Sequence, residues 1–182
     1  ELKRPGNIYT RITNTTNEVF EKRMAALEGG VAAVSTASGQ SAVFLSITNI
    51  CGPGDNIVAQ PFLYGGTFTM FVITLRDMGI EVRFAKSDSA ADLEALVDGR
   101  TKAIFLENIG NPAFNIPDYE PIVEMARRKG ICVMVDNTFG MGGYLFRPFE
   151  WGANVSIHSA TKWICGHGTA LGGVVVDGGN FD

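Results

Sequence analysis

The chain has 182 residues, a formal net charge of −4, and 46% hydrophobic against 19% charged residues. This length suits one domain with a sizeable core, and the scattered, slightly acidic charge argues against a nucleic-acid-binding surface. The chain has no basic-apolar leader and no apolar run near the roughly twenty residues of a membrane-spanning helix, so neither export nor a membrane span is predicted.

Helical and strand patterns alternate along the chain. The periodicity predicts helices over 17–27, 39–50, 67–78, 90–97 and 119–129. It predicts short apolar strands over 32–36, 56–59, 80–85, 102–106, 131–135, 155–158 and 171–176. Because the connections are short, we expect an α/β fold with a mostly parallel sheet covered by helices on both faces.

The lysine in Ser159-Ala160-Thr161-Lys162-Trp163 follows the predicted strand 155–158 and precedes a glycine-rich stretch. A lysine among small hydroxyl residues is poorly placed for a core. It is well placed to form a Schiff base beside a phosphate group that the hydroxyls can bind. We therefore interpret Lys162 as a cofactor-anchoring lysine. Taken alone, the motif would fit a surface lysine in a polar turn.

An aspartate ends another apolar strand, in Val133-Met134-Val135-Asp136. Ligands of open α/β sheets bind at the carboxyl ends of the strands. A carboxylate there can pair with the protonated ring nitrogen of pyridoxal phosphate (PLP), which keeps the ring an electron sink. Asp136 is the candidate for this role, and a helix cap or turn aspartate is the simpler alternative.

Six separated blocks carry a resemblance that runs through essentially the whole chain. With them the chain resembles the Cys/Met-metabolism family of PLP-dependent enzymes, and most closely its O-acetylhomoserine sulfhydrylase branch. The blocks are Tyr9-Thr10-Arg11, Ser38-Gly39-Gln40, Tyr64-Gly65-Gly66-Thr67, Glu107-Asn108-Ile109-Gly110-Asn111-Pro112, Asp136-Asn137-Thr138-Phe139-Gly140 and the Lys162 segment.

The resemblance implies a fold type I PLP-binding large domain. Members of the family are roughly twice as long and continue into a smaller carboxyl-terminal domain. We therefore expect residues 18–182 to be a truncated PLP-binding domain and residues 1–17 to be an amino-terminal arm. The arginine that grips the substrate carboxylate in the family would then lie outside this chain.

Phosphate binding is expected at the start of the helix over 39–50. Free N–H groups and the positive end of the helix dipole favour an anion there. By resemblance, Ser38, Gly39 and Gln40 bind the PLP phosphate with the hydroxyls of Ser159 and Thr161. The family often has methionine at the position of Gln40, so only its backbone role carries over. An N-cap serine followed by glycine is the simpler reading of this block.

Four further residues are expected around the cofactor ring. By resemblance, Tyr64 stacks on the ring and moves protons, Asn111 hydrogen-bonds the ring hydroxyl with Glu107 organising it, and Thr138 supports the ring near Asp136. Stacking of an aromatic face on a pyridinium contributes about 1 kcal/mol. Without the resemblance, these residues would read as ordinary turn signals.

Tyr9 and Arg11 lie in the polar arm. Arginine suits phosphate oxygens, and by resemblance this Tyr-x-Arg reaches the phosphate of a neighbouring subunit. The expected assembly is a homotetramer built as a dimer of dimers. Thr15 stands where the family commonly has proline, which bears on the rigidity of the arm. A disordered, solvated arm is the alternative.

The expected activity is a γ-replacement that converts O-acetylhomoserine and sulfide, or a thiol, into homocysteine and acetate in methionine and cysteine biosynthesis. Lys162, Tyr64 and Asp136 are its candidate catalytic residues, and Lys162 holds PLP as a Schiff base. Methionine γ-lyase and cystathionine γ-synthase or γ-lyase share this chemistry. A dinucleotide-binding dehydrogenase would need a G-x-G-x-x-G after a strand, which is missing. A non-catalytic assembly piece stays open.

The cysteines and histidines predict neither a disulfide framework nor a metal site. Cys51, Cys132 and Cys165 show no C-x-x-C spacing and leave an odd thiol, which favours a reducing, cytoplasmic location. Cys165 with His167 alone is not a metal-ligand set. We expect His158 to be a hydrogen-bonded strand-end residue, and no role is derived for His167.

Overall fold

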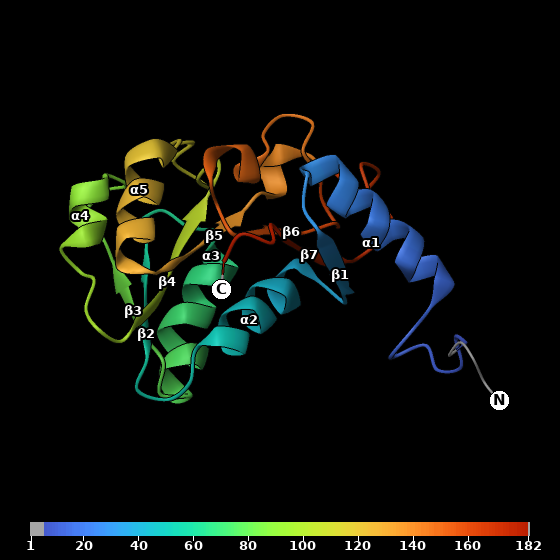
Figure 1. Cartoon of the computed structure of the whole chain (residues 1–182), viewed down its shortest axis with the longest axis horizontal. Helices are drawn as coiled ribbons and strands as arrows, with labels where there is room; N and C mark the ends of the chain where they lie inside the picture. The colour runs from blue at the N-terminus through green and yellow to red at the C-terminus, as the bar shows by residue number, and fades with distance from the viewer. Residues whose placement is uncertain (1–5, 182) are drawn as a thin grey trace.

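The computed structural model describes residues 6–181, and its centre is one seven-stranded sheet (Figure 1). The order across the sheet is β1-β7-β6-β5-β4-β2-β3. Only β7 runs against its neighbours, so the prediction of a mostly parallel sheet is confirmed. The strands are β1 (Ala32–Thr36), β2 (Asn56–Ala59), β3 (Glu81–Phe84), β4 (Thr101–Glu107), β5 (Cys132–Asp136), β6 (Val155–His158) and β7 (Gly173–Asp177).

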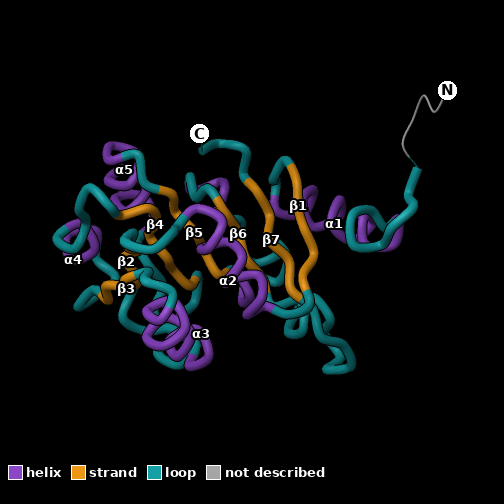
Figure 2. Tube along the Cα trace, turned by 90° about the horizontal axis from the view of Figure 1, so that it is seen from below, coloured by secondary structure: helices purple, strands orange, loops and turns teal. Residues whose placement is uncertain are grey.

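Helices cover both faces of this sheet, as predicted. Figure 1 shows α1, α4 and α5 above it and α2 and α3 below, and Figure 2 views the sheet from the α2 side. The helices are α1 (Thr15–Glu28), α2 (Gly39–Ile50), α3 (Gly65–Thr69), α4 (Ala90–Glu94) and α5 (Tyr119–Lys129). A π-helical segment, η1 (Met70–Leu75), continues α3, and two 3₁₀ turns are η2 (Thr138–Gly140) and η3 (Pro148–Trp151).

Alternation along β4 builds the two layers of the core. Phe105 points to the α2 side, where its ring meets the Phe71 ring edge-on with centroids 5.1 Å apart. Its neighbours Ile104 and Leu106 point to the other side and pack with Ile122 of α5. Successive strand residues face opposite sides, and a strand buried on both sides is therefore apolar throughout.

Local signals set the bounds of α1. The side chain of Asn14 accepts hydrogen bonds from the backbone N–H groups of Thr16 and Asn17, so the helix begins at Thr15 and not at the predicted residue 17. Gly29 ends it in the left-handed region, with φ of 80°. Met24 and Ala25 pack against Val174 and Val176 of β7. The division into an arm over 1–17 and a domain over 18–182 stays a prediction, and residues 1–5 of that arm lie outside the described residues.

Other predicted elements differ from the structure mainly at their ends. The predicted helix over 67–78 begins earlier, at Gly65, and is π-helical over Met70–Leu75. The predicted helix over 90–97 ends at Glu94, and the predicted strand over 171–176 is β7, two residues later at its start. Within residues 6–181, no helix combines the length and apolar character that crossing a membrane requires.

The topology gathers polar loops at one edge of the sheet. Strands β1, β2, β4, β5 and β6 run in one direction, so their carboxyl ends meet there. The loops that leave these ends carry the predicted site residues, from Ser38 after β1 to Lys162 after β6.

Candidate functional site

A cavity of about 600 Å³ lies at this edge. All the predicted cofactor-site residues line it except Tyr9 and Arg11. They are Ser38, Gly39, Gln40, Tyr64, Glu107, Asn111, Asp136, Thr138, Ser159, Thr161 and Lys162. Residues more than 120 positions apart in the sequence therefore meet around one space, whose size is in the range of small-molecule sites.

The start of α2 forms one end of the cavity. Ser38 is the N-cap, and its Oγ accepts a 3.1 Å hydrogen bond from the backbone N–H of Ser41. The N–H groups of Gly39 and Gln40 come before the first intrahelical hydrogen bond and have no partner among the described residues. A Cβ on Gly39 would lie 2.6 Å from the Ser159 Cβ, so only glycine allows the two loops to approach this closely.

Thr161 differs from the other hydroxyl residues at this end. Its Oγ1 accepts a 3.1 Å hydrogen bond from the backbone N–H of Gly172 and lies 3.2 Å from the oxygen of that residue. Thr161 therefore connects the lysine loop to the start of β7 while it lines the cavity. If Thr161 binds a phosphate, the same hydroxyl must serve both the phosphate and Gly172.

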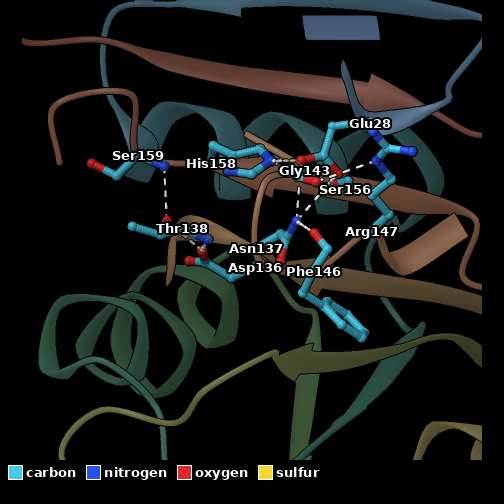
Figure 3. A network of polar contacts seen from close by, with 10 residues as sticks. All are labelled: Glu28, Asp136, Asn137, Thr138, Gly143, Phe146, Arg147, Ser156, His158 and Ser159. Atoms are coloured by element: carbon cyan, nitrogen blue, oxygen red, sulfur yellow. Dashed lines mark hydrogen bonds and ion pairs between the residues drawn. The ribbon is translucent and has the colours of Figure 1, made fainter. Parts of the chain in front are cut away.

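Asp136 faces the cavity from the end of β5. Its Oδ1 accepts two hydrogen bonds from Thr138, one from the backbone N–H at 3.0 Å and one from the hydroxyl at 2.5 Å. The Thr138 hydroxyl oxygen in turn accepts a 2.9 Å hydrogen bond from the backbone N–H of Ser159 (Figure 3). Burial raises the pKa of Asp136, while these hydrogen bonds and the charges of His158 and Lys162 act to lower it.

Lys162 approaches the same cavity from the loop after β6. Its Nζ lies 3.5 Å from Ser159 Oγ, and the side chain is exposed. Phe139 and Trp163 line the wall beside it, with ring centroids 6.1 Å apart. No role was predicted for these two aromatic residues, although Phe139 follows Thr138 and Trp163 follows Lys162 in the sequence.

Glu107 organises the opposite wall. Its carboxylate accepts hydrogen bonds from the backbone N–H groups of Tyr64, at 2.6 Å, and of Asn111, at 3.1 Å. The side chain is buried, and burial followed by the nearby charge of Asp136 raises its pKa to about 8. The Glu107 carboxyl group thus connects the two loops from which Tyr64 and Asn111 line the cavity.

Tyr9 and Arg11 are not part of this cavity. They precede α1, and the Arg11 guanidinium lies 5.2 Å from the centroid of the Tyr9 ring. Tyr9 is exposed, and the described residues before α1 lie near its outer end, apart from the strands (Figure 1). These two residues therefore do not complete the site of their own chain, and their role at a neighbouring subunit stays a prediction.

A buried polar cluster lies next to the site and was not predicted as a unit. His158 hydrogen-bonds Glu28 of α1 through Nε2, at 2.8 Å, which confirms that His158 is a hydrogen-bonded strand-end residue. Asn137 and Ser156 contact the same carboxylate. No periodicity could reveal these contacts, because they join residues more than 100 positions apart.

Comparisons with known proteins show the family of this chain. The family model described as Cys/Met metabolism PLP-dependent enzyme matches residues 1–182. The chain is 54% identical over 181 residues to homocysteine synthase of Schizosaccharomyces pombe, covering all of this chain and 42% of that protein. It is 56% identical over 181 residues to O-acetyl-L-homoserine sulfhydrylase 1 of Thermus thermophilus, covering 99% of this chain and 43% of that protein.

The fold is also similar to that of solved structures of PLP-dependent enzymes. A putative O-acetylhomoserine (thiol)-lyase from Campylobacter jejuni, which contains a pyridoxyl-lysine monophosphate, superposes with a TM-score of 0.92 at 40% identity, over 97% of this chain and 43% of that one. The sheet is thus that of fold type I enzymes. The chain spans less than half the length of these relatives. With its family match and a lysine and a carboxylate facing one cavity, it belongs to the Cys/Met-metabolism family of PLP-dependent enzymes.

Proposed function

We propose that the protein containing this chain is a PLP-dependent O-acetylhomoserine sulfhydrylase. The observation that carries the proposal is the cavity that joins Lys162, Asp136 and the start of α2, in a chain more than half identical to proteins named for this activity. In the reaction, the bond from the γ-carbon to the ester oxygen breaks and acetate leaves with the electron pair. A bond from sulfur to the γ-carbon forms; with hydrogen sulfide as the donor, one of its two protons passes to solvent and the other stays on the thiol of homocysteine.

The residues present fit PLP. Free N–H groups of Gly39 and Gln40 at a helix start suit a phosphate, and the absence of a side chain at Gly39 keeps this cradle open. The Asp136 carboxylate, whose raised pKa reflects a desolvated site, would be stabilised by a cationic ring nitrogen. The Lys162 amine supplies the nucleophile that a covalently held aldehyde requires.

Each group then has a chemical task. When bound, PLP supplies an electron sink that stabilises negative charge on the substrate carbon next to the amine. Asp136 would keep a positive charge on the ring nitrogen, and Lys162 would hold the cofactor and move the proton of the α-carbon. Tyr64 would cover the ring face, with its loop and that of Asn111 fixed by Glu107. Ser38, Ser159 and Thr161 would add hydroxyl groups around the phosphate, and Thr138 would orient Asp136.

The assembly and the location belong to the same proposal. We infer a homotetramer in which Tyr9 and Arg11 bind the phosphate of a neighbouring subunit, because both lie outside their own cavity while the arginine has a geometry suited to phosphate. We infer a cytoplasmic location because Cys51, Cys132 and Cys165 are free thiols. Light scattering of the complete gene product and imaging of a tagged copy in its host test these two points.

A product assay on the complete gene product tests the activity. With PLP, O-acetylhomoserine and sulfide, we expect homocysteine and acetate in equal amounts, and much less product from O-acetylserine or from methionine alone. Lys162→Ala should abolish turnover, while Lys22→Ala, at an exposed lysine of α1, should leave it unchanged. Breakdown of methionine without sulfide would identify a γ-lyase instead. Wild-type turnover in Lys162→Ala would refute the proposal.

A further inference from the structure

Glu28 is a fully buried carboxylate at the last position of α1. Its Oε1 lies 2.8 Å from His158 Nε2, and its Oε2 accepts a 2.9 Å hydrogen bond from the Ser156 hydroxyl. The Asn137 side-chain amide lies 3.1 and 3.2 Å from the two oxygens (Figure 3). The negative end of the helix dipole disfavours a carboxylate at this position, and burial disfavours it further. Its partners on the sheet are what stabilise it there.

These partners lie at the ends of the two strands that carry the cofactor-facing residues. Asn137 directly follows Asp136, and His158 directly precedes Ser159. Because successive residues alternate sides, Asn137 and His158 face α1 while Asp136 and Ser159 line the cavity. On the cavity side, Thr138 joins the same two strand ends. The ends of β5 and β6 are therefore tied together on both sides of the sheet.

We propose that Glu28 is a positioning residue for the PLP site, which holds the ends of β5 and β6 in register through Asn137 and His158 so that Asp136 and Ser159 face the cofactor together. This inference rests on the proposed PLP-binding function and deepens it. A chain that lacked this contact would keep the groups that touch PLP but would hold them in a less defined arrangement.

The contact between Glu28 and His158 also bears on the electrostatics of Asp136, because His158 acts on the pKa of that carboxyl group. The titratable groups that interact electrostatically with Asp136 are His158 from β6, Lys162 from the following loop, Glu107 from β4 and Tyr119 from α5. His158 and Lys162 are the basic groups among them, and both act to lower the pKa of Asp136. Burial raises the pKa of Asp136, and loss of the His158 imidazole, which acts to lower this pKa, would raise it further. As the pH falls, the Asp136 carboxylate would then bind a proton at a higher pH than in the wild type. Its ion pair with a cationic ring nitrogen would be lost at that higher pH.

The test measures PLP binding by the complete gene product in the wild type, in Asp136→Asn as the reference for a lost cofactor contact, and in three further variants. Glu28→Gln replaces the carboxylate of the buried pair, and His158→Gln replaces its imidazole. Glu21→Gln is the matched control, because Glu21 is another carboxylate that connects α1 to the sheet. It accepts hydrogen bonds from the backbone N–H of Ser35 in β1, at 2.8 Å, and from the Ser35 hydroxyl, at 2.7 Å. The readouts are the dissociation constant of PLP and the pH dependence of the absorption band of bound PLP.

We expect Glu28→Gln and His158→Gln each to weaken PLP binding by about tenfold or more, the scale of a lost charged hydrogen bond. In His158→Gln the acid limb of PLP binding should also move to higher pH. Glu21→Gln should stay within about twofold of the wild type, since it leaves the ends of β5 and β6 untouched. Should a single variant fail to fold, the double variant Glu28→Gln/His158→Gln, which keeps hydrogen-bonding groups without charges, is measured in its place with the same expectation.

The results separate this inference from the proposed function. If the wild type and Asp136→Asn differ in PLP binding but Glu28→Gln and His158→Gln behave like the wild type, the positioning role is refuted and the function stands. Equal weakening in all three variants, Glu21→Gln included, also refutes it, because the effect would then be general to the packing of α1. A wild-type protein that binds no PLP overturns the proposed function and this inference with it.

Discussion

The hydroxyl oxygen of Thr138 accepts a 2.9 Å hydrogen bond from the backbone N–H of Ser159. The same hydroxyl donates its proton to Asp136 Oδ1. One side chain therefore sets both the orientation of the carboxylate and the path of the loop that leads to Lys162. Asp136 ends β5 and Lys162 lies in the loop after β6, and Thr138 makes a direct polar connection between the two on the cavity side.

Replacing Thr138 with valine keeps the branched shape but removes this connection. The Ser159 N–H and the Asp136 carboxylate each lose a partner, so we expect PLP binding by the complete gene product to weaken roughly tenfold. Thr138→Ser keeps the hydroxyl and should stay close to the wild type. Fluorescence titration with PLP measures the difference. Equal affinity of the valine variant and the wild type would show that the hydroxyl does not organise the site.

Glu107 makes the PLP-free protein sensitive to alkaline pH. Its pKa in the folded chain is about 8, because of burial and then the charge of Asp136, whereas an unfolded chain has a value of about 4.3. The folded state therefore binds more protons between these values. The stabilisation from this group is present below the unfolded pKa and is lost as the pH rises through about 8.

Isotope-edited infrared spectroscopy of the PLP-free protein reports this carboxyl group directly. We expect a protonated carboxyl band that disappears near pH 8 and is missing in Glu107→Gln. In Asp136→Asn the titration should move to lower pH, because one cause of the raised pKa is removed. A Glu107 band that titrates near pH 4 in the wild type would contradict the desolvated site that the structure shows.

Much of the fold could be predicted from the sequence because local signals carry it. The apolar run at Val133-Met134-Val135 and the pair Gly29-Gly30 after a helical pattern define their elements on their own. The reversed direction of β7 could not be read in this way, because it depends on pairing with β1 and β6, which lie far away in the sequence. The π-helical segment over Met70–Leu75 likewise lacks a distinct sequence signal.

The candidate site could likewise be predicted only in part, where local sequence signals mark its residues. Asp136 could be singled out because it is a polar residue at the end of an apolar strand, and Lys162 because hydroxyl residues and glycines surround it after another apolar strand. Glu28 could not, since a glutamate at the end of a surface-like helix ordinarily faces water. Its burial results from tertiary contacts with residues 109 to 130 positions away. Local patterns therefore identify groups at the cavity better than the contacts that support them.

Gly39 is required by the close approach of two loops. An added Cβ would lie 2.6 Å from the Ser159 Cβ and 2.8 Å from its Cα, so in Gly39→Ala the backbone of one loop must move. Overpacking of this kind costs about 1–3 kcal/mol, and we expect PLP binding to weaken about tenfold or more. Gly99→Ala is the control, because a Cβ there meets no atom within 4 Å. A Gly39→Ala protein with wild-type PLP affinity would remove the phosphate-binding role of this loop.

Variants at Arg11 and Lys162 should restore activity to each other when they are combined in one dimer. Both Arg11→Ala and Lys162→Ala are expected to impair the complete gene product, the first by weakening phosphate binding and the second by removing the covalent anchor. In a symmetric dimer that shares its sites, a mixed pair of these variants contains one site with both residues intact. Co-expression with two different affinity tags should therefore restore roughly a quarter of the wild-type activity, since about half of the dimers are mixed and each has one intact site. Mixed dimers isolated through both tags that stay inactive would show that Arg11 serves the site of its own chain, and full activity of Arg11→Ala alone would show that it serves no site.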